Sequence, residues 1–525
     1  MVTGAANWAR ELESQAQKLG DRPFLYLVYE NRFISFREMD ANANRVANYL
    51  LKTGAGPGDG VAVLMSNSPQ FLDVFFGIQK LGMYINTVNT ALRGEGLAFI
   101  IDNSDTRFLV VDYDLIGLYE TVKDAIPQIE KVFVNTLEAP DSFVVPEGML
   151  DLRDAYTDDM STQKPDVEFD ENSILILMYT SGTTGLPKGV VSRYNNNVVD
   201  RIRPLADFAL PSDSVYYTAL PLFHGNALFI TTTMSLIAGC TMALSKRFSA
   251  SSFWEEIWYS KATTFNTIGA IIPILMKQPE RPHERDHKID HITSAGCPAD
   301  MWVPFEERFN IKIWEAYAAI DGSGLIMNFG DGPKGSVGKP MNSVVKIVDE
   351  KGDEVPAGEV GELLFYVPKD LESKVEYYKN PDASKEKTRG DWEYTGDLMY
   401  QDEEGYIYFV GRATDSMRRR GENVSAYDVE KVILKHPAIL ECAVYAVPSE
   451  MAEDEIMVSL RLVEGKTIAP EELVAFLGDK LAKFAIPRYV RIVDDFPRTE
   501  TFRIRKNELK EVGVTKYTYD AEKGG

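Results

Sequence analysis

The stretch SILILMYTSGTTGLPKGVV, residues 173–191, determines how the rest of the chain is interpreted. Its apolar first half predicts a buried strand, which runs directly into hydroxyl residues and glycines. Glycine lets successive backbone N–H groups face one anion, while hydroxyls and a lysine add donors and positive charge. The loop contains Thr180, Ser181, Gly182, Thr183, Thr184, Gly185, Lys188 and Gly189. The sequence therefore predicts a phosphate-binding loop directly after a buried strand.

Two other interpretations of this loop are weaker. The Walker A loop has the pattern GxxxxGK[ST], which the stretch does not match. A merely flexible turn would also be rich in serine, threonine and glycine. Six such residues and a lysine, all following one buried strand, make a simple turn improbable.

Strands and helices alternate on the N-terminal side of the loop. Gly60–Met65, Arg107–Asp112 and Lys131–Asn135 are short apolar runs, and Pro69–Leu81 has apolar residues at helical spacing. Such alternation implies parallel sheets covered by helices on both faces. We therefore expect an α/β protein with a large N-terminal domain of stacked, mostly parallel sheets.

The pattern changes after about residue 340. Val344–Val348, Gly361–Tyr366 and Gly405–Val410 are short strand-like runs between Gly, Pro and Asp, which predicts a small antiparallel or barrel-like unit. A charged stretch, Gly411–Ala426, then separates this unit from the C-terminal part of the chain.

The C-terminal part has its own compact α+β pattern. Helices are expected at Tyr427–His436 and Pro470–Phe484, with strands at Cys442–Val447 and Ile456–Val463 between them. We expect three parts in chain order: an N-terminal domain at 1–411, a hinge at 412–417 and a small C-terminal domain at 418–525.

The composition indicates a globular protein and excludes some partners. Of the 525 residues, 45% are apolar and 26% are charged, enough apolar surface for full-sized cores. The 79 acidic and 56 basic residues give a net charge of −23, which argues against a nucleic-acid partner. The three cysteines show no close pairing, and the N-terminus carries charges where a signal peptide needs an apolar stretch. Both features favour the cytoplasm.

The uncharged stretch Ser214–Ser245 is long enough for a membrane helix. It contains Pro221, His224 and several threonines and glycines, which favour a buried strand–turn–helix–strand segment instead. We therefore expect no integral membrane segment.

Several segments together resemble the acyl-adenylate-forming (AMP-binding) superfamily, which includes acyl-CoA synthetases. YTSGTTGLPKGV (179–190) is similar to its phosphate-loop signature, and residues 58–83 and 394–415 resemble further family segments, so the resemblance covers nearly the whole chain. KRFSASSFWEE (246–256) and RRRGENVSAYDVE (418–430) are most similar to two groups. These are the fatty-acid transport protein/very-long-chain acyl-CoA synthetases and the carnitine/crotonobetaine-CoA ligases.

The resemblance implies an AMP-forming carboxylate–CoA ligase. Such an enzyme uses ATP and Mg²⁺ to convert a carboxylic acid to acyl-AMP, releasing pyrophosphate, and then transfers the acyl group to the thiol of CoA. Positioning and neutralisation of charge dominate the first step, because an anionic carboxylate must approach a polyanionic triphosphate. Mg²⁺ supplies much of that neutralisation.

The resemblance also assigns roles to individual residues. The residues implied to bind ATP or AMP are Thr180, Ser181, Gly182, Thr183, Thr184, Lys188, Gly296, Cys297, Pro298, Tyr317, Asp397 and Arg412. The implied substrate pocket is His224, Ile268, Gly269, Ala270 and Ala318. Asp321 and Thr183 would hold Mg²⁺, and the implied catalytic residues are Arg503, Asp321, Thr183, Lys188 and His224.

Taken singly, several of these residues have simpler interpretations. Tyr317 could be a core tyrosine, His224 a structural histidine and Arg412 a solvated arginine. His283, His287 and His291 recur at intervals of four, but their charged surroundings favour a solvated face over a metal site.

Two segments depart from the family pattern. The usual YGxTE reads YAAID at 317–321, so Asp321 replaces the glutamate that coordinates Mg²⁺, with one methylene less. Near the C-terminus, the usual lysine is replaced by Arg503, and Lys506 is the nearest alternative. Arginine and lysine are not interchangeable in such a role.

These departures leave alternatives open. The chain could adenylate an acid for an acceptor other than CoA, or bind nucleotide and acyl group with weakened chemistry. The acid could be long and hydrophobic, small and polar like carnitine, or aromatic. A homodimer is also left open.

Overall fold

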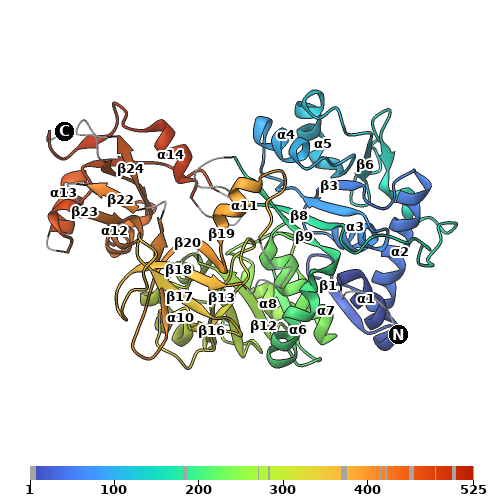
Figure 1. The fold of residues 1–525 in the computed structure, drawn as a ribbon, viewed down its shortest axis with the longest axis horizontal. Helices are drawn as coiled ribbons and strands as arrows, with labels where there is room; N and C mark the ends of the chain where they lie inside the picture. Colours follow the sequence, from blue (N-terminus) through green and yellow to red (C-terminus); the bar gives the residue numbers. More distant parts are fainter. Residues whose placement is uncertain are drawn as a thin grey trace.

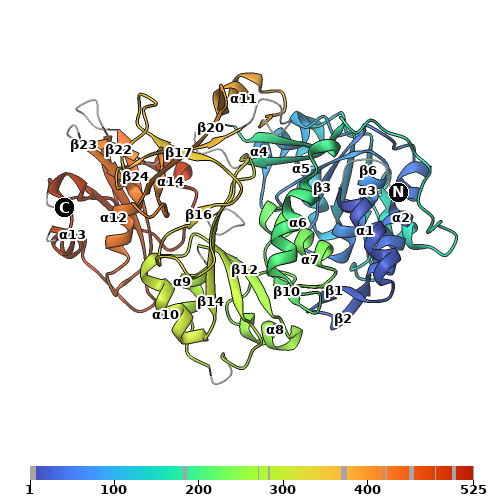
Figure 2. The same ribbon diagram turned by 60° about the horizontal axis from the view of Figure 1, so that its bottom comes forward.

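Two large sheets with helices around them form most of the molecule (Figure 1). The computed structural model describes residues 7–180, 186–269, 271–281, 284–367, 375–413, 416–419, 422–448, 454–478, 480–498 and 504–523. In both Figure 1 and Figure 2, the C-terminal part, coloured orange to red, lies at one end of the molecule, away from the blue N-terminal part.

The first large sheet contains a run of parallel neighbours from β1 through β11, β10, β12 and β13 to β14. Across the sheet its strands are β16 (Lys339–Pro340), β15 (Ile326–Asn328), β14 (Lys312–Tyr317), β13 (His291–Ala295), β12 (Thr264–Ile268), β10 (Val215–Thr218), β11 (Thr241–Leu244), β1 (Pro23–Leu27) and β2 (Arg32–Ser35).

The second large sheet is parallel from β7 to β8 and ends in the antiparallel β8–β9 hairpin. Its order is β7 (Leu150–Asp151), β6 (Lys131–Asn135), β5 (Phe108–Asp112), β3 (Gly60–Leu64), β4 (Tyr84–Thr87), β8 (Ile174–Thr180) and β9 (Lys188–Arg193).

Helix α3 (Pro69–Lys80) is buried along its entire length. The Ser68 hydroxyl accepts from Phe71 N at its N-terminus, and Pro69 supplies the first turn. One apolar core joins α3 to both large sheets, which places the helix between them. The other N-terminal helices are α1 (Trp8–Leu19), α2 (Phe36–Lys52), α4 (Gly94–Asn103), α5 (Ile116–Val122), α6 (Val198–Ala209), α7 (Thr233–Ala238), α8 (Phe253–Ser260), α9 (Ile271–Met276) and α10 (Ala299–Phe309).

A smaller antiparallel sheet follows the two large ones along the chain. It consists of β17 (Val345–Val348), β18 (Gly361–Tyr366), β20 (Trp392–Gln401), β19 (Thr388–Arg389) and β21 (Ile407–Arg412), with α11 (Pro381–Lys387) leading into β19. This is the small unit that the sequence predicts.

The C-terminal part has a separate apolar core between 417 and 519. Its elements are β22 (Ser416–Arg419), β23 (Glu422–Ser425), α12 (Ala426–Ile433), β24 (Ile439–Pro448), β25 (Asp454–Leu462), α13 (Pro470–Gly478), β26 (Tyr489–Ile492), α14 (Lys506–Val512) and β27 (Tyr519–Asp520). Hydrogen bonds between described residues join it to the rest of the chain: Lys277 Nζ donates to Leu440 O, and Ser425 Oγ donates to Val410 O at 3.4 Å.

The expected α/β architecture is confirmed, but two C-terminal helices end earlier than expected. The predicted helix Tyr427–His436 ends at Ile433. The predicted helix Pro470–Phe484 ends at Gly478, and Lys483–Ala485 forms a separate 3₁₀ turn. Glycine is among the weakest helix formers, and the sequence prediction gave it too little weight.

The uncharged stretch Ser214–Ser245 forms β10, a π-helix at Asn226–Thr232, α7 and β11, as predicted. In the part of the chain that the structure describes, no helix is both long and apolar enough to span a bilayer.

Candidate active site

Four neighbouring strands of the first large sheet end at one edge. The chain segments that follow β10, β12, β13 and β14 contain His224, Ile268–Gly269, Gly296–Pro298 and Tyr317–Asp321, respectively. Because β10, β12, β13 and β14 are parallel, their carboxyl ends meet at the same edge of the sheet, where α/β proteins bind ligands. The topology therefore gathers residues that the sequence places almost a hundred positions apart.

Two glycines allow the chain to pass closely at this edge. A Cβ on Gly269 would lie 2.6 Å from the carbonyl oxygen of Gly296, too close for any side chain. Gly296 itself has a φ of +95°, which favours glycine. The predicted pocket residue Gly269 and the predicted adenine residue Gly296 thus touch through their backbones.

A first group of residues, the nucleoside cluster, consists of Tyr317, Asp397 and Arg412. The Tyr317 hydroxyl donates to Asp397 Oδ2 at 2.5 Å, and Arg412 Nε lies 3.4 Å from Asp397 Oδ1. Asp397 is only 5% exposed. Burial, and then the Asp397 carboxylate, raises the pKa of the Tyr317 hydroxyl, which keeps it a donor.

The turn before Asp397 explains its position. Asp397 pairs with Arg412 across the β20–β21 ladder. Gly396 has a φ of +76°, and its N–H donates to Glu362 Oε1 at 2.8 Å. Asp397 N in turn donates to Thr395 Oγ1 at 3.1 Å. The Thr-Gly-Asp sequence is therefore a specific backbone bend that directs the carboxylate toward Tyr317.

A second group, the phosphate cluster, consists of Lys188, Asp321, Tyr377 and Lys387. Lys188 pairs with Thr180 at the end of the β8–β9 hairpin where the connecting loop begins, and residues 181–185 of this loop lie outside the described residues. The Lys188 ammonium lies 5.1 Å from the centre of the Tyr377 ring. The Tyr377 hydroxyl donates to Asp321 Oδ2 at 2.6 Å.

The second cation of the phosphate cluster is Lys387, the last residue of α11. Its Nζ lies 3.6 Å from Asp321 Oδ2, and its side chain is only 9% exposed. Beside it, Glu393 is fully buried and accepts from Ser323 N at 3.0 Å. Burial raises the pKa of the Glu393 carboxyl, whereas Lys387 lowers it.

The residue set fits a Mg²⁺ ion that is bound partly by substrate. Among the described residues, no cluster of three or more His, Cys, Asp or Glu side chains could hold a metal alone. Mg²⁺ is commonly bound by one or two carboxylates together with substrate phosphates. Asp321 supplies such a carboxylate, and its Oδ2 is positioned by Tyr377 and Lys387. Thr183, the other predicted ligand, lies outside the described residues.

The segment around His224 contacts both sides of this site. A Cβ on Gly225 would lie 2.8 Å from Ile320 Cδ1 and 3.8 Å from Met178 Sδ. Ile320 immediately precedes Asp321, and Met178 lies in β8. A π-helix begins at Asn226, a form often found at functional sites. His224 therefore lies beside the phosphate cluster rather than apart from it.

The backbone after β13 is held by a carboxyl from the neighbouring strand. Glu315, in β14, accepts from Gly296 N and, at 3.2 Å, from Cys297 N. Burial raises the pKa of the Glu315 carboxyl to about 8, although these N–H groups act in the opposite direction.

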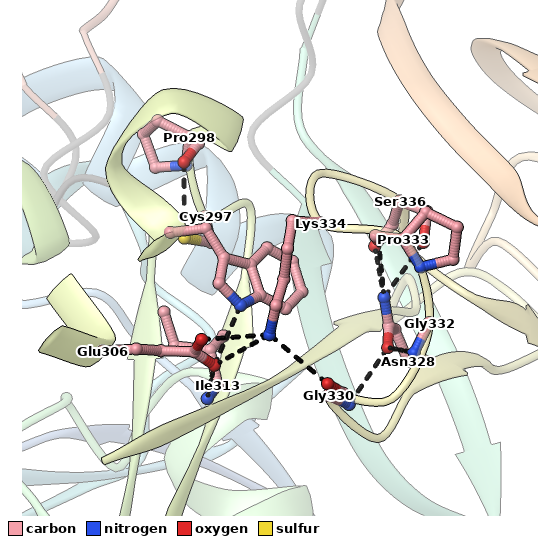
Figure 3. Close-up of polar contacts among 11 residues, drawn as sticks. Cys297, Pro298, Glu306, Ile313, Asn328, Gly330, Gly332, Pro333, Lys334 and Ser336 are labelled. Carbon is pink, nitrogen blue, oxygen red and sulfur yellow. Dashed lines mark hydrogen bonds and ion pairs between the residues drawn. The ribbon is translucent and has the colours of Figure 1, made fainter. Parts of the chain in front are cut away.

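Helix α10 directly follows Cys297 and Pro298 in the chain and is itself held by polar contacts (Figure 3). Glu306 accepts from Ile313 N at 2.9 Å and from Lys334 Nζ at 3.0 Å. Asn328 Oδ1 accepts from Gly330 N at 3.0 Å and thereby shapes the loop that carries Lys334 (Figure 3). The predicted adenine segment is thus followed directly by a helix whose position is fixed by polar contacts.

Sequence reasoning missed Glu315, Tyr377 and Lys387. Tyr377 reaches the site because Glu376–Tyr378 pairs with the outer edge of β9, a contact between distant parts of the chain. The only signal for Glu315 is its place in a strand that leads into the YAAID segment.

The structure does not bring every predicted residue to the site. Lys506 Nζ pairs with Glu430 Oε1 at 2.8 Å, within the C-terminal part. Ala318 is exposed at the edge next to Tyr317. The predicted residues that lie outside the described ones are Ser181, Gly182, Thr183, Thr184, Ala270 and Arg503.

The expected solvated face of the histidines is wrong for the two that the structure describes. His287 Nε2 contacts Phe309 O at 2.9 Å. His291 is 8% exposed and stacks on Trp314 at 3.7 Å. Both rings are structural because strand β13 and the chain before it are packed against aromatic side chains.

Two family profiles match most of the chain. The family profile described as "AMP-binding enzyme" matches residues 12–369, and that of the "AMP-binding enzyme C-terminal domain" matches residues 428–503. The chain is 30% identical over 498 residues to the crotonobetaine/carnitine–CoA ligase of Proteus mirabilis (strain HI4320), covering 92% of this chain and 95% of that protein.

Two solved structures are similar over nearly their whole length. ATP-bound MatB from Rhodopseudomonas palustris has a TM-score of 0.83 at 25% identity, covering 96% of this chain and 98% of that one. The o-succinylbenzoate coenzyme A synthetase MenE of Bacillus subtilis, in complex with AMP, has a TM-score of 0.80 at 25% identity, covering 95% and 98%. The resemblance to the carnitine ligase group is confirmed, and that to the fatty-acid transport group stays a prediction. The chain belongs to the family of AMP-binding enzymes.

Proposed function

We propose that this enzyme is an AMP-forming carboxylate–CoA ligase. The observation that carries the proposal is the position of the segment Tyr317–Asp321. Tyr317 donates a hydrogen bond to Asp397. Asp321 accepts a hydrogen bond from Tyr377, and the ring of Tyr377 lies next to the Lys188 ammonium. Ile320 lies against Gly225, next to His224. The segment Tyr317–Asp321 therefore lies next to groups that could bind a ribose, a phosphate and a carboxylate.

In the first step, a carboxylate oxygen of the acid attacks the α-phosphorus of ATP. The bond from that phosphorus to the bridging oxygen breaks, and pyrophosphate leaves with its electron pair. Lys188 and Lys387 would offset the negative charge that gathers here, and Asp397 would accept from the ribose hydroxyls. A carboxylate has enough lone pairs to do so while keeping Tyr317 and Arg412.

Mg²⁺ is part of this proposal. Asp321 and Thr183 would hold it, and it would supply charge neutralisation at the triphosphate. Tyr377 keeps one oxygen of Asp321 fixed, so the other oxygen has a defined direction.

In the second step, the CoA thiol gives up its proton to water and its sulfur bonds to the acyl carbon. The bond from that carbon to the bridging oxygen breaks, and AMP leaves with this oxygen. The family resemblance suggests that the C-terminal part turns about residues 412–417 between the two steps. Lys277 and Leu440 would separate in that turn. Burial lowers the pKa of Lys277 in the present arrangement. Arg503 or Lys506 would serve the first step in one of the two arrangements.

The relatives support a choice of acid without fixing it. The Proteus mirabilis protein is named for crotonobetaine and carnitine, which supports a small polar acid. Long-chain and aromatic acids remain in the test panel. A cytoplasmic location and a homodimer also stay predictions, the first supported by three buried, unpaired cysteines at 240, 297 and 442.

The decisive experiment is an acid-dependent assay of the purified enzyme with ATP and MgCl₂. With CoA present, we expect pyrophosphate, AMP and an acyl-CoA thioester in equal amounts. ADP as the product, or no acid-dependent turnover across polar, alkyl and aromatic acids, would contradict the proposal.

The same assay separates the two alternative functions. Acyl-AMP that accumulates without reacting with CoA would indicate another acceptor, such as an amine or a pantetheine arm. ATP binding without pyrophosphate release would indicate a homologue with weakened chemistry. Arg503→Lys tests whether the arginine limits the first step.

A further inference from the structure

Strand β12 carries a buried amide on the face that lines the predicted acid pocket. Successive side chains of a strand point to opposite faces, so Thr264, Asn266 and Ile268 share one face. Phe265, on the other face, packs against Phe253 with ring centres 5.0 Å apart. Asn266 therefore lies on the same side as Ile268 and is only 4% exposed.

The partner of Asn266 is Asn226, two residues after His224. Asn266 Nδ2 donates to Asn226 Oδ1 and, at 3.5 Å, approaches Asn226 O. Both contacts are to acceptors, which fixes the Asn266 amide with its nitrogen toward Asn226. The pair thus connects β12 to the start of the π-helix beside His224.

The oxygen of the Asn266 amide makes no corresponding contact to the described part of the chain. Asn266 Oδ1 is buried and has no hydrogen-bond partner among the residues that the structure describes. A buried carbonyl without a partner is costly, because water no longer compensates it. Asn226, in contrast, is half-buried.

We propose that the acid substrate carries a hydroxyl or N–H group on its acyl chain, and that Asn266 Oδ1 accepts a hydrogen bond from it. This inference rests on the proposed function and adds the substrate class. His224 precedes Asn226 by two residues, and Ile268 follows Asn266 by two residues on the same face of β12. A donor on the acyl chain would meet Asn266 while the carboxylate faces the phosphate cluster. A plain alkyl chain would leave the buried oxygen unpaired.

The test uses matched acids in which a methyl replaces a hydroxyl, such as 3-methylbutanoate beside 3-hydroxybutanoate and 4-methylbenzoate beside 4-hydroxybenzoate. Pyrophosphate release gives kcat/KM for each acid. For the wild type, we expect at least one hydroxy acid to exceed its methyl partner by about tenfold or more. Asn266→Leu should reduce that ratio by at least about tenfold.

Thr264→Val is the matched control. Thr264 lies on the same face of β12, is 3% exposed, and already donates to His291 O at 2.8 Å. Its replacement should leave the hydroxy-to-methyl ratio unchanged. If Asn266→Leu does not fold, the smaller change Asn266→Ala, which also removes the acceptor oxygen, provides the same ratio test.

A purely structural Asn266 would give a different result. Its substitution would lower kcat/KM equally for both members of every pair, so that the hydroxy-to-methyl ratio stays the same, and this outcome would overturn the inference. Wild-type preference for the methyl acid in every pair would do the same. Pyrophosphate release with unchanged ratios would overturn the inference alone, whereas no release with any acid would overturn the proposed function with it.

Discussion

The nucleoside cluster and the phosphate cluster hold their carboxylates in different ways. In the nucleoside cluster, Asp397 is nearly buried and is bonded by Tyr317. In the phosphate cluster, the Asp321 side chain is 23% exposed, and Tyr377 and Lys387 both reach one of its oxygens. One carboxylate is fixed in place, and the other keeps an oxygen facing the site.

This difference between the two carboxylates suggests that the two clusters have different roles in the reaction. A buried carboxylate that is held by protein donors suits a part of the ligand that does not change during the reaction, such as the ribose. A more open carboxylate among cations suits the triphosphate, where charge moves and a metal takes part. Substitutions in the nucleoside cluster should therefore weaken ATP binding, whereas those in the phosphate cluster should also slow the reaction.

The largest effect is expected for Asp397→Ala. It removes the ribose acceptor and leaves Tyr317 and Arg412 without their carboxylate. We expect kcat/KM for ATP to fall by about 100-fold or more, mainly through KM. Steady-state kinetics with varied ATP would measure this. Glu403→Ala, at an exposed site in the same sheet, is the control and should change kcat/KM by less than about twofold. An Asp397→Ala enzyme with normal ATP kinetics would break the comparison.

A smaller loss is expected for Lys188→Ala. The lysine is a point charge at the end of the β8–β9 hairpin. We expect kcat to fall by about 10- to 50-fold, with Lys188→Arg recovering part of it. Single-turnover measurement of pyrophosphate release would locate the loss in the first step. Unchanged ATP turnover would remove Lys188 from the phosphate cluster.

Lys387→Met should have an intermediate to small effect. Without this lysine, Asp321 and the buried Glu393 lose a shared cation, so the site becomes more negative. We expect KM for ATP to rise by about five- to tenfold. Lys385→Met, on the exposed side of α11 with 81% of its side chain accessible, should match the wild type. Equal behaviour of the two variants would exclude Lys387 from the site.

The smallest effect, on stability, concerns Glu315→Gln. The pKa of Glu315 rises from 4.5 to about 8 on folding, so stability that is present below about pH 4.5 is lost as the pH rises toward 8. Glutamine cannot ionise and keeps an acceptor for Gly296 N. The free energy of unfolding of the variant should therefore fall less between pH 4.5 and 8. Urea unfolding at several pH values tests this, with the exposed Glu307→Gln as control. Parallel pH profiles for the wild type and Glu315→Gln would contradict the raised pKa.

The sequence predicts the parts of this site that lie within one continuous motif. The strand before the phosphate loop, the Thr-Gly-Asp bend and the YAAID segment are each short and adjoin their own strands. Tyr377 and Lys387 escaped prediction because only the folded chain brings Glu376–Tyr378 to the edge of β9. The early end of α13 at Gly478 was missed because apolar spacing outweighed the glycine in the prediction. Local patterns thus reveal individual ligand contacts, and topology determines which of them meet.

The most direct test is exchange of labelled pyrophosphate into ATP, without CoA, by the wild type, Asp397→Ala and Lys188→Ala. Exchange reports acyl-AMP formation alone, because it requires reversal of the first step. For the wild type, we expect exchange that depends on the acid and on MgCl₂. A high ATP concentration should restore part of the exchange rate of Asp397→Ala but none of the exchange rate of Lys188→Ala. Exchange without any acid, or two variants that respond alike to high ATP, would contradict the division between the two clusters.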